Sequence, residues 1–178
     1  MRALWSAKLA AIFVVLGVAI GVTAGRAEAQ PVRFTVPLGS CLAAPGTLMP
    51  ATLEIYSLAC ERLDGGTGLI AFGQENLFVA GVGPGTYNIR VKVANWLSVW
   101  VRNVTMGWAG VSLTFPTAIN GDTNGNDTVE LADLSSILVN FGSTGAPGIP
   151  GDLNWNGELT LQDITIVLLN FGASGEGC

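Results

Sequence analysis

Hydrophobic and polar residues alternate along most of the chain between residues 30 and 118. Successive side chains of a strand point to opposite faces, so this alternation is typical of strands that bury one face. The segments that alternate, or that are rich in β-prone residues, are 33–36, 53–58, 86–93, 96–104 and 111–115. Short strands separated by Gly and Pro turns predict an antiparallel β-sandwich over residues 30–118.

The alternation also assigns faces to the strands predicted over 86–93 and 96–104. The face expected to be core holds Tyr87, Ile89, Val91, Val93, Leu97, Val99 and Val101. The opposite face would carry Trp96 and Trp100 among Arg and Lys side chains. Indole rings can stack on sugars and pack under cations, so the pattern predicts a weak carbohydrate site at Trp96 and Trp100. The alternative is that both rings shield the sheet or cover the next domain.

After residue 119 the apolar residues recur at steps of three and four, which is the period of an amphipathic helix. They are Leu131, Leu134, Ile137, Leu138 and Phe141 in one segment, and Leu161, Ile164, Val167, Leu168 and Phe171 in the next. Gly142 and Gly172 stand where the helices should end. Neither helix could bury its stripe alone, so we expect the stripes to cover each other as core, with Val129 and Leu159 meeting between the loops.

Before each predicted helix the same polar pattern occurs, at 121–133 and again at 151–163. Calcium takes six to eight oxygen ligands, and a 12-residue loop can supply them from positions 1, 3, 5, 7, 9 and 12. In the first loop these positions are Asp122, Asn124, Asn126, Thr128, Glu130 and Asp133. In the second they are Asp152, Asn154, Asn156, Glu158, Thr160 and Asp163. The repeat therefore predicts two Ca²⁺ sites, with Thr128 and Glu158 binding through their carbonyls.

The two loops differ at the sharp turn of position 6, which usually requires Gly. Gly157 meets that requirement in the second loop, whereas the first loop has Asp127, a residue that tolerates positive φ better than most. The first loop offers three ligand carboxylates and the second only two. Affinity depends on both charge and rigidity, so their order stays open.

A duplicated loop that ends in Asp and is followed by one helix resembles a type I dockerin module, and the resemblance covers the last third of the chain. The alternative is an Asn/Asp/Gly-rich turn repeat that binds no metal. Dockerins bind cohesin modules in a Ca²⁺-dependent way and tether polysaccharide-degrading enzymes to scaffolds. Family dockerins often place polar recognition pairs at loop positions 10 and 11, where this chain has Leu131-Ala132 and Leu161-Gln162. The resemblance implies a cohesin-like partner, and the departure at these two positions gives the alternative that the helix pair docks on the neighbouring sandwich or on another surface protein.

The segment 79–91 holds the sequence Gly83-Pro84-Gly85-Thr86-Tyr87 followed by alternating residues. It resembles the hairpin of carboxypeptidase-regulatory-like and collagen-adhesin B-type sandwiches, which have a prealbumin-like fold. That resemblance implies a spacer, a stalk or a weak carbohydrate-binding module.

Charge and composition narrow the function further. The net charge is −5, the chain has no His, and no Lys or Arg follows Arg102. These features exclude His-based catalysis and give no basic patch for nucleic acid. Eight acids between residue 119 and the end would repel one another unless cations neutralise them. We therefore expect calcium binding to be coupled to folding there, so that chelation melts residues 119–172.

Residues 1–29 have the pattern of a secretory signal peptide: Arg2 and Lys8, an apolar run, and the cleavage motif Ala27-Glu28-Ala29. The alternative is a membrane anchor, although the run is short for a bilayer, and no later stretch is long and apolar enough to span one. In an exported protein Cys41 and Cys60 could form a disulfide, the alternative being two buried thiols. Cys178 is then left over, as a free thiol or for an intermolecular bond.

These observations predict an α+β chain of two abutting domains. Residues 1–29 are the signal peptide, 30–118 an antiparallel β-sandwich, and 119–178 a small helical dockerin-like module with two calcium loops. The predicted function is a secreted, non-catalytic docking or adhesion protein of bacterial type, linked to polysaccharide degradation. It would bind a cohesin-like or other surface protein, with polysaccharide as a further candidate partner, and would bind neither nucleic acid nor, after signal cleavage, membrane. The alternative is a carbohydrate-binding accessory or stalk protein in which calcium is only structural.

Overall fold

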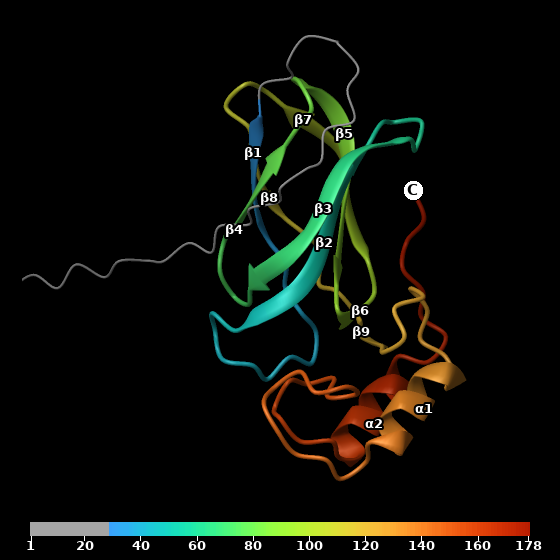
Figure 1. Cartoon of the computed structure of the whole chain (residues 1–178). Helices are drawn as coiled ribbons and strands as arrows, with labels where there is room; N and C mark the ends of the chain where they lie inside the picture. The colour runs from blue at the N-terminus through green and yellow to red at the C-terminus, as the bar shows by residue number, and fades with distance from the viewer. Residues whose placement is uncertain (1–28) are drawn as a thin grey trace, which may run out of the picture.

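The structure is a computed structural model that describes residues 29–178 (Figure 1). The predicted signal peptide, apart from its last residue, lies outside the described residues. The strands are β1 Gln30–Thr35, β2 Leu48–Tyr56, β3 Arg62–Ala71, β4 Asn76–Ala80, β5 Gly85–Val93, β6 Asn95–Trp96, β7 Val99–Met106, β8 Val111–Thr114 and β9 Asn120–Asp122. The helices are α1 Leu131–Val139 and α2 Leu161–Leu169. Within residues 29–178, no helix is both long enough and apolar enough to cross a membrane.

Two sheets form a β-sandwich, as the alternating pattern predicts. One has the strand order β4-β1-β8 and the other β3-β2-β5-β7. Their inward side chains form one core, whose largest members include Phe34, Phe115, Met49, Leu53 and Ile89. The sandwich is not wholly antiparallel, because β1 pairs parallel with β8. The prediction of an antiparallel sandwich is therefore corrected at β1, which lies between β4 and β8 and is antiparallel only to β4.

The faces predicted for residues 95–101 are wrong at Trp96. Asn95 has a positive φ of 73°, which breaks the strand and turns Trp96 into the sandwich core, where it is fully buried. Its Nε1–H donates to the carbonyl of Gly39 at 2.8 Å. Leu97 then points the other way, into a second apolar cluster beside the helices. A break of one residue exchanges the two faces, because the side-chain period of a strand is two.

Each helix begins at a polar cap. Glu130 caps α1 and Thr160 caps α2, and in both a capping box joins the cap to the Asp three residues later. Such caps satisfy N–H groups that have no partner inside the helix. Gly142 and Gly172 follow the helices with φ of 82° and 85°, a conformation that glycine adopts without strain. The cap and stop signals therefore fix both helices at nine residues.

The second cluster joins the two repeats to the sandwich. Val129, Ile137, Leu153, Leu159 and Val167 are buried in it, together with Leu97 from the sandwich. In return, Trp155 of the second repeat lies in the sandwich core. The repeats therefore share side chains with the sandwich across the boundary, and Figure 1 shows α1 and α2 packed below β6 and β9.

The predicted fold class, an α+β chain with a separate small helical module, is wrong. The described residues are mostly strand, with nine strands and only two nine-residue helices. The physical reason is that each helix buries few residues of its own and depends on the loops and the sandwich for the rest of its packing. The predicted boundary between residues 118 and 119 stays a prediction.

Candidate functional site

The two predicted calcium loops have the same backbone shape. Positive φ recurs at equivalent places: Gly125 and Trp155 at position 4, and Asp127 and Gly157 at position 6. The last Asp of each loop is fully buried. Asp133 Oδ1 accepts N–H bonds from Thr123 and Asn124 at 2.9 and 3.2 Å. Its counterpart Asp163 Oδ1 accepts from residues 153 and 154 at 2.9 and 3.4 Å.

The first Asp of each loop also turns inward and holds the loop closed. Asp122 accepts N–H bonds from Gly125 at 2.7 Å and from Asp127 at 2.8 Å. Asp152 accepts from Asn156 at 3.1 Å and from Gly157 at 2.9 Å. Both carboxylates are at most 1% exposed. Buried carboxylates need such hydrogen bonds because burial otherwise penalises their charge.

Most side chains at positions 3, 5, 7 and 9 form hydrogen bonds within their own repeat. Asn124 and Asn154 accept the N–H two residues on, as do Asn126 and Asn156. Asn and Asp form such turns readily. Among the remaining predicted ligands, the Thr128 hydroxyl donates to Asn126, Glu130 accepts from the Asn126 amide, Thr160 caps α2, and the Glu158 side chain is exposed.

The donor chemistry of the loops fits a hard cation. Among residues 29–178, no three His, Cys, Asp or Glu side chains gather closely enough to hold a metal by themselves. A bound ion would therefore need Asn and backbone oxygens as well as the two buried Asp of each loop. Carboxylate, amide and carbonyl oxygens are the ligands that Ca²⁺ takes. The loops therefore suit Ca²⁺ better than a metal that needs nitrogen or sulfur ligands.

A group of ion pairs joins the first loop to the sandwich. Asp127 lies 3.0 Å from Arg90 and 3.2 Å from Lys92, both on β5. It also accepts a hydrogen bond from the Ser98 backbone N–H at 2.7 Å and another from the Ser98 hydroxyl. Burial alone would raise the pKa of Asp127, but the Ser98 hydrogen bonds and Lys92 outweigh it and lower the pKa to about 2. Asp127 is therefore charged at neutral pH and bonded to the sandwich.

Lys92 makes a second contact, with Asp122 at position 1 of the loop. The Lys92 side chain is 17% exposed and the Asp122 side chain is fully buried. The first predicted calcium ligand thus already has an ammonium group against one of its oxygens. None of the salt bridges found within residues 29–178 involves Asp152 or Asp163 of the second loop.

Trp96 and Trp100 do not form a platform for sugar. Trp96 is in the core, and Trp100 is 7% exposed beneath residues 174–178. The Trp100 Nε1–H donates to the Glu176 carbonyl at 2.6 Å, and the Tyr56 ring packs against it with centroids 5.1 Å apart. Arg102 lies over the ring at 5.3 Å. The chain itself therefore covers the surfaces that a sugar would need.

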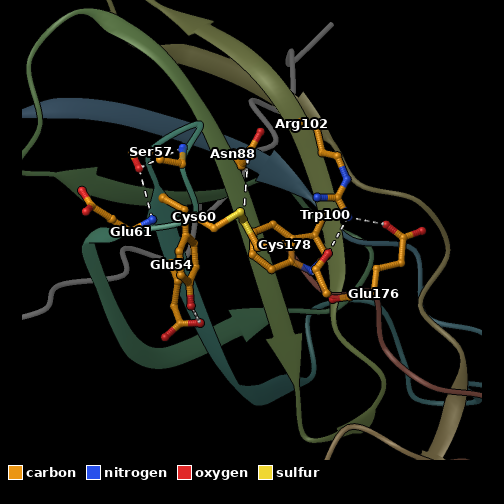
Figure 2. The surroundings of a disulfide bond; sticks show 12 residues. Glu54, Ser57, Cys60, Glu61, Asn88, Trp100, Arg102, Glu176 and Cys178 are labelled. Carbon is orange, nitrogen blue, oxygen red and sulfur yellow. Dashed lines mark hydrogen bonds and ion pairs between the residues drawn. A yellow bond between two sulfur atoms is a disulfide. The ribbon is translucent and has the colours of Figure 1, made fainter.

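A disulfide joins Cys60 to Cys178 (Figure 2). The predicted Cys41–Cys60 pair is wrong, because Cys41 is a free, partly buried thiol. Cys41 precedes Leu42, whose N–H donates to Asn154 of the second loop, whereas Cys60 lies in the turn between β2 and β3 beside the end of the chain. The bond therefore fixes the segment that covers Trp100, rather than bracing the sandwich internally.

The helices expose a large apolar surface that the sequence analysis treated as core. Ile137 and Val167 are fully buried, but eight other apolar residues on the helices and their ends are between 50% and 85% exposed. These residues, called the helix patch below, are Leu131, Leu138, Val139, Phe141, Leu161, Leu168, Leu169 and Phe171. They form four pairs at equivalent positions of the two repeats. The sequence carried a signal for this surface: Val139 and Leu169 lie outside the predicted stripes, so the helices are apolar on more than one face.

A hollow of about 430 Å³ lies beside the patch. It is lined by Phe141 and Gly142 after α1, and by Leu159 and Leu161 among residues of the second loop. Asn156, Glu158, Thr160 and Gln162 complete the lining, so the hollow joins one apolar residue of the helix patch from each repeat, Phe141 and Leu161, to polar side chains of the second loop. Such surfaces mark contact sites more often than scattered apolar residues do.

No known family and no curated protein matches the sequence. Among the solved structures that are similar to the chain, two are interface mutants of a type II cohesin–X–dockerin complex from Acetivibrio cellulolyticus. One, with an N-terminal interface mutation, has 20% identity and a TM-score of 0.58 over 82% of this chain and 97% of that chain. The other, with a C-terminal interface mutation, has the same identity and coverage and a TM-score of 0.59.

At this identity the likeness shows the fold alone. The chain has a predominantly β fold of the kind found in these complexes, which agrees with the correction of the fold class above. The expected resemblance holds at the level of cohesin–dockerin complexes, and the narrower resemblance to a type I dockerin is not shown. The calcium ligands stay a prediction, as does the prealbumin-like hairpin.

Proposed function

We propose that this protein is a secreted, non-catalytic docking protein that binds a protein partner through the helix patch. The observation that carries the proposal is the patch itself: eight exposed apolar side chains, paired between the two repeats. Large exposed apolar patches are costly in water and mark sites of protein contact. The symmetry of the pairs argues that the surface is built by the repeat rather than left by chance.

The proposed role of calcium is to hold this surface together. Asp133 and Asp163, the last predicted ligand of each loop, also close the capping boxes of α1 and α2. An ion bound by these carboxylates would therefore fix the first turn of the helix that carries the patch. Because an unfolded chain holds no such site, the binding free energy of each ion adds to folding.

The proposed partner is a cohesin-like protein of an extracellular assembly for polysaccharide breakdown. The support is that chains of this fold occur in cohesin–X–dockerin complexes. The two similar structures are such complexes, and each carries a mutated interface. The patch is apolar and lacks Lys and Arg, since none follows Arg102 in the sequence. A complementary partner would present an apolar surface with few acidic groups, because the loops beside the patch are already negative.

The experiment is to immobilise a panel of cohesin-type domains and measure binding of this protein with Ca²⁺ and with chelator. The matched variants are Leu138→Asp with Leu168→Asp in the patch, and Leu63→Asp on β3, which is comparably exposed. The double variant Leu138→Asp with Leu168→Asp should weaken binding by at least about a hundredfold. Burying two charges in an apolar contact makes the binding free energy less favourable by several kcal/mol. The control should bind normally.

Chelator should abolish binding and reduce the helical circular dichroism of residues 119–172. If Ca²⁺ changes neither the spectrum nor the binding, the calcium role is wrong. If the patch variants bind as the wild type does, the docking surface lies elsewhere.

A further inference from the structure

The first loop receives a cation from the sandwich. Lys92 lies on β5, and its Nζ contacts Asp122 Oδ2 and lies 3.2 Å from Asp127 Oδ1. Asp122 stands at loop position 1, and Asp127 at the turn of position 6. Since no Lys or Arg follows Arg102 in the sequence, among residues 29–178 only the sandwich can supply a side-chain cation to either loop.

The second loop has no such group. Both oxygens of Asp152 are held by N–H groups of its own repeat, from Gly148, Asn156 and Gly157. The salt bridges of residues 29–178 place no cation on this carboxylate or on Asp163. Trp155, rather than a charged residue, connects this loop to the sandwich.

An ammonium group and Ca²⁺ cannot both use the same carboxylate oxygen without repelling each other. The repulsion is strong here because Asp122 is fully buried and Lys92 largely so, and buried charges are poorly screened. The ion must therefore displace the lysine, and the cost of displacing it lowers the affinity of the ion relative to what the loop's own ligands would give.

We propose that Lys92 is the built-in counter-cation of the first loop and lowers the Ca²⁺ affinity of that loop alone. This inference rests on the proposed calcium role of the loops. It assigns Lys92 two functions: neutralising Asp122 and Asp127 before calcium arrives, and setting the calcium concentration at which the first loop fills. The protein would then respond to calcium in two steps rather than one.

The test is calcium titration by calorimetry in a chain whose second loop is disabled by Asp152→Asn, so that the heat reports the first loop. In that background Lys92→Met should bind Ca²⁺ about tenfold more tightly, since it keeps the apolar stem and removes the charge. Arg33→Met is the matched control, because Arg33 lies on β1 in the other sheet. It removes the same charge and should change the affinity by less than about twofold.

A second measurement needs no variant. The sequence has two lysines, Lys8 and Lys92, so acylation by an amine reagent can be followed at Lys92 by peptide mass spectrometry. Calcium should expose the ammonium and speed its acylation by about tenfold in the wild type.

The outcomes separate the two proposals. An unchanged or weaker affinity in Lys92→Met overturns the role of Lys92, and so does an acylation rate that calcium leaves unchanged. Absence of calcium binding in the wild-type chain overturns the calcium role itself. Calcium binding to the wild type with no effect of Lys92 removes only the present inference.

Discussion

The two loops share one backbone shape but are attached to the sandwich by different chemistry. The first loop uses charge: Asp127 and Asp122 are bonded to Arg90 and Lys92 of β5. The second uses an apolar side chain, since Trp155 enters the sandwich core. The two copies of the repeat therefore share one backbone geometry but differ in their contacts with the sandwich. The backbone geometry follows from residues within each loop, whereas the contacts depend on which part of the sandwich lies opposite that loop.

The same difference appears at position 6. Gly157 turns with φ of 85°, and a Cβ added there would lie 2.5 Å from the Gly145 carbonyl oxygen. Asp127 turns with φ of 68° and uses its side chain to reach the sandwich. The second loop needs glycine because the backbone of Gly145 lies against it. The first loop has an equivalent neighbour in Gly175, whose N–H donates to the Asp127 carbonyl, and the Asp127 carboxylate lies beside that glycine.

The largest expected effect comes from the disulfide, which distinguishes the loops because the backbone hydrogen bonds of the final segment join it to the first loop. The Gly175 N–H donates to the Asp127 carbonyl and the Val129 N–H to the Ala173 carbonyl, both at 2.8 Å. Cys178→Ser should lower the free energy of unfolding by about 4 kcal/mol, because the bond closes a loop of 118 residues. Urea denaturation measures this loss.

Hydrogen exchange then tests where the loss falls. Amides of residues 123–129 should lose protection in Cys178→Ser, while those of 153–159 should keep most of theirs. Cys41→Ser is the matched control, because Cys41 is a free thiol, and it should change stability by less than about 1 kcal/mol. Equal loss of protection in both loops would contradict the proposed division.

The loop turns can be predicted from the sequence and several other features cannot, and the two outcomes have a common physical cause. The turns held by Asp122 and Asp152 depend on residues three to five positions away, so local sequence predicts them well. The pairing of Cys60 with Cys178, and the cover over Trp100, depend on segments far apart in the sequence. No local period contains that information.

The helix stripes show a different limit. Periodicity identified the helices correctly, but it could not tell a buried face from an exposed docking face. Ile137 and Val167 are buried while Leu138 and Leu168, one position on, are exposed. The distinction depends on how many neighbours the fold supplies, and two nine-residue helices cover little of each other.

A substitution at position 6 of the second loop should have the next largest effect. Gly157→Ala adds a Cβ close to the Gly145 carbonyl and forces an L-residue to keep positive φ, which together cost about 3 kcal/mol. Asp127→Ala at the equivalent position needs no such approach to backbone, so the clash should be absent there. Thermal melts with Ca²⁺ should show a fall of about 10 °C for Gly157→Ala.

Calorimetric titration of the same protein supplies the loop-specific readout, because only calcium binding to the second loop should weaken. The matched control is Gly125→Ala in the first loop, where the φ of 78° is also positive but a Cβ would meet nothing within 4 Å. It should cost only about 1 kcal/mol. If Gly125→Ala is as harmful as Gly157→Ala, the backbone contact at Gly145 is not what separates the loops.

The smallest effect is a pH dependence confined to the first loop. The pKa of Asp127 is lowered from 3.8 to about 2, against the effect of its burial, by Ser98 and Lys92. A lowered folded pKa gives stability that is present above the unfolded pKa and is lost as pH falls through the folded one. At pH 6 the wild type should therefore exceed Asp127→Asn by about 2 kcal/mol, and at pH 3 by about half of that.

Urea denaturation of both chains between pH 3 and pH 6, at saturating calcium, measures the difference. Glu176→Gln is the control: its pair with Arg102 is exposed, so it should cost less than about 1 kcal/mol throughout. If the difference in unfolding free energy between wild type and Asp127→Asn stays constant down to pH 3, the Asp127 charge adds nothing to stability.

The apolar attachment of the second loop has no titrating group. The difference in unfolding free energy between wild type and Trp155→Phe should therefore be independent of pH. A pH-dependent effect at Asp127 together with a pH-independent effect at Trp155 would show that charge attaches the first repeat to the sandwich and that apolar packing attaches the second.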